Sequence, residues 1–206
     1  EKLYTKGGKV TAGLKVLKDT EWQEHFGLNL TDEDIFGEFG QKLDKRTEAS
    51  TQKDVIATAI LLEKVHPNKR KDFLKNTLIS VKKQQKAQRL FEEKVEDVSS
   101  TSEVRVLSRK LHQRGLTISD WYELEKDGFE PEKAEKVWSL AQKAGVTQEP
   151  PHSIITGDDI LMLSSTQKHG KWVGEILQRA RHAQDHDVFS DRNSALLWLK
   201  QQKDLP

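Results

Sequence analysis

The sequence predicts an all-α fold, with a multi-helix body followed by a small helical tail domain. Apolar residues recur at intervals of three and four, as they do along one face of a helix. β-Branched residues do not alternate over a useful length, so no strand is expected. Apolar residues make up 34% and charged residues 33% of the 206 positions, a balance that suits helices burying one stripe and exposing the opposite face.

The amino-terminal elements are predicted from their spacing and start signals. A helix is expected over 11–18, where two leucines lie three apart, and a helical segment over 22–26 would place two aromatic rings on one face. Thr31 followed by Asp34 is typical of a capping box at the start of the next helix. Ser50 is expected to cap the apolar helix that follows it.

The central elements are separated by proline, glycine and one polar stretch. Pro67 ends the apolar helix, because proline lacks the amide hydrogen that a continuing helix needs. A basic helical region follows, and the polar segment 96–103 (EDVSSTSE) is the best candidate for a module boundary. Helices are then expected over 104–113 and 119–126. Pro131 and Gly145 bracket a further helix in the usual order, with proline inside its start and glycine past its end.

The tail is predicted from an extended linker and two helices. The linker 147–153 (TQEPPHS) contains two prolines, each of which restricts the residue before it to extended backbone. Helices are expected over 171–184 and 190–202, with Ser190 as the N-cap of the second. The predicted division is a helical segment with a basic face at 1–98, a second helical segment at 99–149, and a small helical tail domain at 150–206.

The composition excludes several classes of protein. The chain has no cysteine, which excludes disulfides and thiolate zinc sites and is compatible with the reducing cytoplasm. No apolar run approaches the roughly 20 residues that span a bilayer, so no membrane is expected among its partners. The chain starts at Glu1 and lacks a signal-like segment, which predicts part of a longer, cytoplasmic protein.

Charges of the two signs are segregated along the chain. From Lys64 to Phe91 there are nine Lys or Arg residues and one acid, Asp72. From Asp120 to Glu135 there are seven acids, with only two lysines between them. A basic face attracts polyanions, whereas the simpler alternative is a solvated helix surface.

No motif for covalent or metal chemistry is expected to function here. Asp32-Glu33-Asp34 has the residue sequence of a two-metal carboxylate pair. It occupies a predicted first helical turn, however, where acids are stabilised by the helix dipole. Asp185-His186-Asp187 lies in a connector without convergent ligands. There is no cysteine, no Gly-x-Ser-x-Gly elbow and no glycine-rich phosphate loop. The sequence therefore predicts no catalytic residue and no metal-binding residue in this chain.

A candidate anion site precedes the helix at 171–184. Its apolar face (Val173, Ile176, Leu177 and Ala180) is expected in the core, while Lys168, His169 and Lys171 gather at its start, where unpaired amide groups favour a phosphate. Gly170 and Gly174 would allow a backbone to approach closely. The alternative is that Gly174 merely admits a neighbouring helix.

A family resemblance is carried by three segments, ITGDDILML (155–163), GKWVGEILQRARHAQ (170–184) and VFSDRNSALLWLK (188–200). Together they resemble the carboxy-terminal end of bacterial-type CCA-adding tRNA nucleotidyltransferases, the class II group that also includes bacterial poly(A) polymerases. Upstream, AGLKVLKDTEWQEHF (12–26) resembles the segment beyond the family's neck, and 57–90 fits its helical body. The matching elements are Thr156-Gly157, Asp159 to Leu161, Gly170, Val173 to Leu177 and Asn193 to Leu199.

The resemblance implies a tRNA-binding segment without its own catalytic centre. It identifies 1–98 as the neck and body segment with a basic face, 99–149 as the continuation of the body, and 150–206 as a tail that contacts tRNA. In that family a β-rich head carries the metal-binding carboxylates and selects the nucleotide, while the helical body and tail clasp the acceptor stem and elbow of tRNA. Mg and ATP or CTP are therefore implied for a head on the same or another chain, and no cofactor is implied for this segment. Some members carry a His-Asp metal pair in the body, but this chain has Leu-Leu-Glu-Lys at 61–64, so phosphohydrolase activity is not expected.

The residues expected to contact RNA are basic side chains and one glycine. The acidic segment from Asp120 to Glu135 is expected to face away from RNA. The expected RNA-binding residues are Lys69, Arg70, Lys71, Lys75, Lys82, Lys83, Lys86, Lys168, His169, Gly170, Lys171, Arg179 and Arg181.

Two alternatives remain open at the level of sequence. A helical protein-interaction or dimerisation module, without a catalytic or RNA-binding role, predicts tight partner binding and an exposed apolar patch. A standalone hydrolase would need convergent ligands that the sequence does not show. Whether the complete enzyme adds CCA, part of CCA or a poly(A) tail depends on the head, where nucleotide choice resides.

Overall fold

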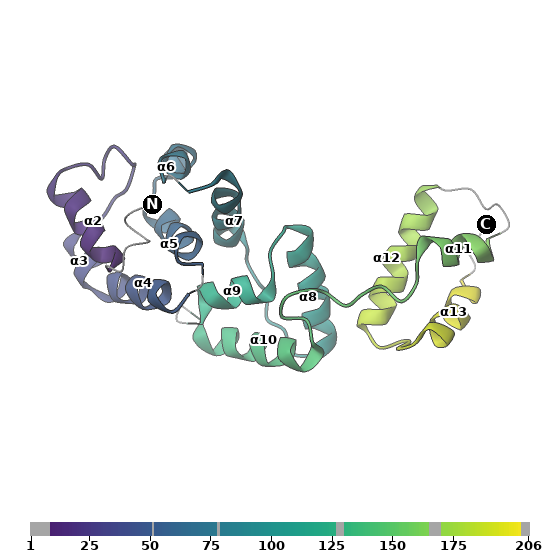
Figure 1. Cartoon of the computed structure of the whole chain (residues 1–206). Helices are drawn as coiled ribbons and strands as arrows, with labels where there is room; N and C mark the ends of the chain where they lie inside the picture. The colour runs from purple at the N-terminus through teal and green to yellow at the C-terminus, as the bar shows by residue number, and fades with distance from the viewer. Residues whose placement is uncertain (1–8, 51, 78, 127–129, 165–169, 203–206) are drawn as a thin grey trace.

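The computed structural model describes residues 9–50, 52–77, 79–126, 130–164 and 170–202. Within these ranges the chain is all-α, and its β-structure is limited to an isolated antiparallel bridge between Leu28 and Val65. The predicted fold class is therefore confirmed. Figure 1 shows an elongated molecule in which the helices from α2 to α10 form a body, and α11 to α13 form a tail at the opposite end from α2.

The helices follow one another with short connections. The body contains α2 (Val10–Asp19), α3 (Asp32–Phe36), α4 (Glu38–Ala49), α5 (Lys53–Leu61), the 3-10 helices η1 (Leu62–Lys64) and η2 (Pro67–Lys69), α6 (Arg70–Asn76), α7 (Val81–Glu92), α8 (Thr101–Gln113), α9 (Ile118–Glu125) and α10 (Pro131–Ala144). The tail contains α11 (Gly157–Leu163), α12 (Lys171–Asp185) and α13 (Arg192–Lys200). In the described residues, no helix combines the length and the apolar character needed to cross a bilayer.

Two hydrophobic clusters hold the described residues together. The body cluster runs from Val10 to Val146, and the tail cluster runs from Ile155 to Leu199. Val98 and Val104 both belong to the body cluster, so the segments 1–98 and 99–149 contribute to one core, whereas 150–206 has its own.

Helix α5 lies at the centre of the body because it is apolar on every side. Each residue from Val55 to Leu61 is buried, and α5 packs against α4 and α7. A helix that is hydrophobic all round is stable only when neighbours cover each face. The more amphipathic helices α4 and α7 therefore cover α5 and expose their own polar sides.

Several predicted helix ends are confirmed by their capping contacts. Thr31 and Asp34 form a reciprocal capping box at the start of α3, so Asp34 has the structural role that the sequence predicts. Pro131 is the first residue of α10, and Gly145 follows its end with φ of 69°, a left-handed conformation that glycine adopts without strain.

The two predicted serine caps are wrong. Ser50 follows the last residue of α4, and its hydroxyl accepts a hydrogen bond from the Gln52 amide, while α5 begins at Lys53. At the start of α13 the N-cap is Asp191 in place of Ser190. The Asp191 carboxylate accepts hydrogen bonds from the amides of residues 193 and 194, and an anion gains further from the helix dipole.

The segment 22–26 forms turns in place of the expected helix. Glu21 has a φ of 60°, which interrupts helical continuation after α2. Consequently the two aromatic rings do not share a buried face. Phe26 packs against the body core, whereas Trp22 is 60% exposed.

Candidate nucleic-acid interface

The basic region of the body falls on η2, α6 and α7, three consecutive elements near the middle of the body segment. Helices α6 and α7 pack against each other. The predicted contacts on these elements divide into exposed cations and cations that hold the fold together. The exposed ones, none of which forms an ion pair within the described residues, are Lys69, Lys71, Lys75 and Lys82.

The other three predicted cations of this region have partners within the body. The guanidinium of Arg70 lies 4.6 Å from the centroid of the Phe91 ring, in cation–π geometry. The ammonium groups of Lys83 and Lys86 lie 2.5 Å and 2.8 Å from carboxylate oxygens of Asp54 and Asp120. These side chains stabilise the packing of α7, so the basic surface available to a ligand is smaller than the sequence indicates.

Asp120 connects the acidic and basic segments directly. Its side chain is only 5% exposed and forms an ion pair with Lys86. The same carboxylate accepts hydrogen bonds from the side-chain amide of Gln52 and the backbone amide of Thr117. A buried carboxylate is tolerated only when it is fully hydrogen-bonded or paired. The acidic segment that begins at Asp120 therefore starts against the basic helix α7, and it does not lie wholly on a separate face as its sequence suggests.

In the tail, no side chain of the described residues is seen to cap the amide groups at the start of α12. Gly170 is the N-cap and makes no capping hydrogen bond, the first turn contains no acid, and Lys171 is exposed. The space that Gly170 leaves is occupied by the ring of Trp172, because a Cβ there would lie 2.7 Å from that ring. Among the described residues, a Cβ on Gly174 would meet nothing within 4 Å, so this glycine does not admit a neighbouring helix of that part of the chain.

The remaining predicted residues lie along or before α12. Arg179 is exposed, and the Nε of Arg181 donates to the Ser153 hydroxyl at 2.9 Å. Lys168 and His169 lie outside the described residues, so their part in an anion site stays a prediction.

Arg181 lies at a pocket that the sequence does not reveal. This junction pocket, of about 350 Å³, lies where α8, the linker after α10 and α12 meet. Two arginines from distant parts of the chain, Arg109 and Arg181, line it together with two histidines. The residues that line it are Arg109, His112, Gln113, Glu149, Pro150, Pro151, His152, Ser153 and Arg181.

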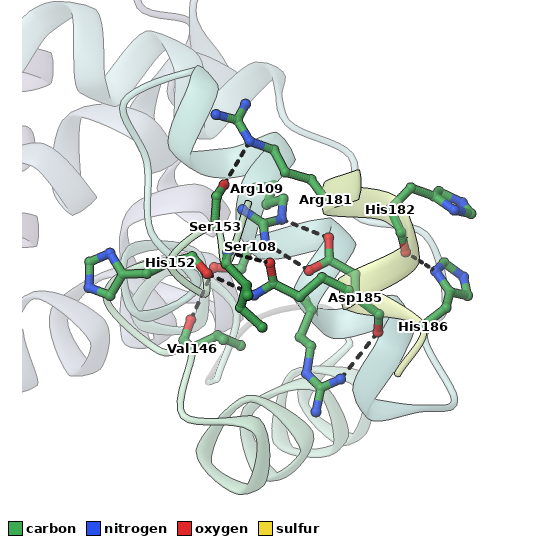
Figure 2. A network of polar contacts seen from close by, with 12 residues as sticks. Ser108, Arg109, Val146, His152, Ser153, Arg181, His182, Asp185 and His186 are labelled. Carbon is green, nitrogen blue, oxygen red and sulfur yellow. Dashed lines mark hydrogen bonds and ion pairs between the residues drawn. The ribbon is translucent and has the colours of Figure 1, made fainter. Parts of the chain in front are cut away.

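Figure 2 shows how the polar groups at this junction are arranged. The Arg109 guanidinium points at the Asp185 carboxylate, and Arg181 reaches the linker at Ser153. The imidazoles of His182 and His186 stack on the outer side, with ring centroids 4.2 Å apart. The signal that could have indicated this arrangement is the pair of arginines four residues apart on α8, at 105 and 109.

The structure gives the charged connector Asp185-His186-Asp187 a structural role. Asp185 forms an ion pair with Arg109, and Asp187 forms one with Arg105, so both carboxylates neutralise arginines of α8. In the described ranges, no group of three or more His, Asp or Glu side chains is placed to hold a metal ion.

Electrostatics within the tail favour an ionised carboxylate at Asp159. Burial acts to raise the pKa of Asp159, but hydrogen bonds from Thr156 and the nearby Arg192 guanidinium outweigh it and lower the pKa below its ordinary value. The Arg192 Nη2 lies 2.5 Å from the Asp159 carboxylate, which joins the start of α13 to the start of α11. This carboxylate is therefore committed to the tail fold.

Comparison with known proteins found no match. No family model, no curated protein and no solved structure matches it. Any assignment of function therefore depends on the residues and their geometry.

Proposed function

We propose that this chain is the tRNA-binding part of a nucleotidyltransferase that adds CCA to tRNA 3′ ends. The observation that carries the proposal is the set of exposed lysines on η2, α6 and α7 (Lys69, Lys71, Lys75 and Lys82), which have no carboxylate partner among the described residues. Unpaired cations gathered on neighbouring helices attract a polyanion. Asp72 is the one acid between Lys69 and Lys82 in the sequence.

The tail extends the same chemistry to a second surface. Lys171 at the uncapped start of α12 and Arg181 at the junction pocket provide phosphate-binding groups beyond the body. Contacts of this type position an RNA by shape and backbone charge and do not depend on base sequence. This selectivity suits a protein that must accept every tRNA.

The division of labour follows the family resemblance. The body and tail would hold the acceptor stem and elbow, while a catalytic head on the same or another chain would bind Mg and ATP or CTP. The setting we propose is the cytoplasm. This segment supplies no group to the nucleotidyl transfer itself.

The test compares two double variants that remove equal charge. Lys71→Ala with Lys75→Ala removes exposed cations from α6, and Lys136→Ala with Lys143→Ala removes exposed cations from α10, on the acidic side of the body. The first pair is expected to weaken tRNA binding by about tenfold, because each lost phosphate contact is worth roughly an order of magnitude or less at low salt. The second pair is expected to have a much smaller effect. Equal effects of the two pairs would contradict a localised RNA surface.

A second candidate function has one observation in its favour. Met162 on α11 and Leu197 on α13 are 81% and 61% exposed, and these two helices contact each other in the tail. Exposed apolar side chains that gather into one patch are typical of a protein-interaction surface. A helical interaction module predicts that the chain binds no tRNA, and that Met162→Ser with Leu197→Ser weakens self-association measured by sedimentation. Unchanged self-association in that variant would remove this alternative.

A further inference from the structure

Several polar contacts join the tail to the body. The hydrophobic clusters of the body and the tail share no residue, and α12 of the tail packs against α8 of the body. No cluster of buried apolar residues therefore spans the two parts within the described ranges. The charged and hydrogen-bonding groups at the junction are consequently the candidates for fixing the angle between them.

The central contact is a bidentate ion pair. The Nε and Nη2 of Arg109 lie 2.7 Å and 3.0 Å from the two carboxylate oxygens of Asp185, as Figure 2 shows. The Asp185 side chain is 2% exposed and that of Arg109 is 15% exposed. Two parallel hydrogen bonds between planar groups restrict orientation more than a single lysine contact could.

A second arginine on the same face of α8 binds the end of α12. The Nη1 of Arg105 donates to the Asp187 carboxylate at 2.6 Å and to the Asp185 carbonyl at 3.2 Å. That carbonyl belongs to the last residue of α12, where carbonyl groups lack helical partners and the helix dipole is negative. The guanidinium thus supplies the hydrogen bond and the positive charge that this helix end needs.

The linker is bound to the same helix end. The Gln184 side chain donates to the His152 carbonyl at 2.7 Å and accepts from the Ile154 amide at 3.1 Å. Pro150 and Pro151 further restrict the backbone just before these contacts. The linker therefore does not act as a free hinge.

We propose that Arg109 and Asp185 are positioning residues that fix the angle of the tail, so that the basic surfaces of body and tail bind one RNA together. The RNA part of this inference rests on the proposed function. A preformed angle means that the second surface meets the RNA without a further loss of orientational freedom. Loss of the ion pair would leave each basic surface intact, but the two surfaces would no longer be oriented to bind one RNA together.

The direction of the expected effect separates this proposal from a simple charge effect. Asp185→Asn removes a negative charge, so electrostatics alone predicts tighter tRNA binding. The positioning role predicts binding weaker by about tenfold, because the effective concentration of the second surface falls. Glu175→Gln is the matched control, since Glu175 is exposed on the same helix and the substitution changes the net charge equally. That control is expected to bind tRNA as tightly as the native chain, or more tightly.

A distance measurement tests the angle without RNA. The chain has no cysteine, so spin labels can be attached at Ser139→Cys on α10 and Gln178→Cys on α12, both exposed positions. Pulsed electron resonance should give a narrow distance distribution for the labelled native chain and a broad one when Asp185→Asn is added. Circular dichroism with equal helix content would show that both variants remain folded.

A chemical tether provides the rescue. Arg105→Cys with Asp187→Cys leaves the net charge unchanged and places two thiols where the native side chains touch. Joining them with a short bismaleimide in the Asp185→Asn chain should restore native tRNA affinity without restoring the lost carboxylate. A loss of fold elsewhere in the tail would not respond to this tether.

The distance distributions and the tRNA affinities together test the proposal that the Arg109–Asp185 pair fixes the angle of the tail. A narrow distribution in Asp185→Asn overturns it, and so does a broad distribution with undiminished tRNA affinity. A broad distribution, weaker binding and rescue by the tether support it. If the native chain fails to bind tRNA, the proposed function is wrong, and the distance distributions by themselves decide whether the pair fixes the tail.

Discussion

The ammonium nitrogen of Lys86 on α7 lies 2.8 Å from Oδ1 of Asp120 on α9. Lys82, one turn earlier on the same helix, is exposed and forms no ion pair within the described residues. The two lysines look equivalent in the sequence, yet one stabilises the body and the other is available to a ligand. This difference can be measured.

Lys86→Met should destabilise the body, whereas Lys82→Met should not. The first change leaves the Asp120 carboxylate, 5% exposed, without its cation, and we expect a loss of about 1–3 kcal/mol in the free energy of unfolding. The second change affects an exposed side chain, with an expected effect within about 0.5 kcal/mol. Urea denaturation measures both. Tenfold weaker tRNA binding by folded Lys86→Met, with full binding by Lys82→Met, would reverse the assigned roles.

Alanine at two glycines should change stability in opposite directions. Gly174 lies within α12, and a Cβ there meets nothing, so Gly174→Ala should stabilise the tail by about 0.5–1 kcal/mol. Gly145 has a φ of 69°, so Gly145→Ala should destabilise the end of α10 by about 1 kcal/mol. Thermal unfolding distinguishes the signs. Destabilisation by Gly174→Ala would indicate that this position is covered in solution.

The stability of the tail should depend on pH through Asp159. Its pKa is lower in the folded chain than its ordinary value of 3.8, because the hydrogen bonds from Thr156 and the charge of Arg192 outweigh burial. The stability from this carboxylate is therefore complete above its unfolded pKa and is lost as the pH falls through the lower folded pKa. Asp159→Asn should flatten the decline in melting temperature below about pH 4. An equally steep decline in the variant would assign the acid sensitivity to other groups.

Arg181→Ala tests the junction pocket as part of the RNA surface. Removal of one phosphate contact should lower the magnitude of the slope of log affinity against log salt by about 0.9. Lys200→Ala is the control, because Lys200 is exposed at the end of α13. Anisotropy of labelled tRNA measures the slopes. The same slope in both variants and the native chain would place the pocket outside the interface.

Local patterns were sufficient to predict the fold class and several helix ends. The apolar spacing indicated all-α structure, and the capping box at Thr31 depends on residues only three apart. The predicted cap at Ser50 is wrong because α5 begins only at Lys53, and the Ser50 hydroxyl accepts from the Gln52 amide before the helix starts. The predicted cap at Ser190 is wrong because the Asp191 carboxylate is a stronger acceptor one residue later. Such local competition is difficult to rank from sequence.

The division of the cations could not be predicted, because it depends on contacts distant in sequence. Lys83 meets Asp54 from 29 positions earlier, and Arg109 meets Asp185 from 76 positions away. The sequence identified the basic character of the region but not the carboxylates that partly neutralise it. Likewise, the sequence predicts Arg181 on α12 as an RNA contact, but it does not indicate Arg109, which lines the same pocket.

The most direct test of the account measures the affinity of the native chain for unmodified tRNA from about 50 to 200 mM salt, the range over which phosphate contacts weaken strongly. A tRNA-binding surface of exposed lysines should give submicromolar binding at the lowest salt and a linear decline of log affinity with log salt, with a slope that corresponds to several phosphate contacts. Tight binding that ignores salt, or no binding in dilute buffer, would contradict it.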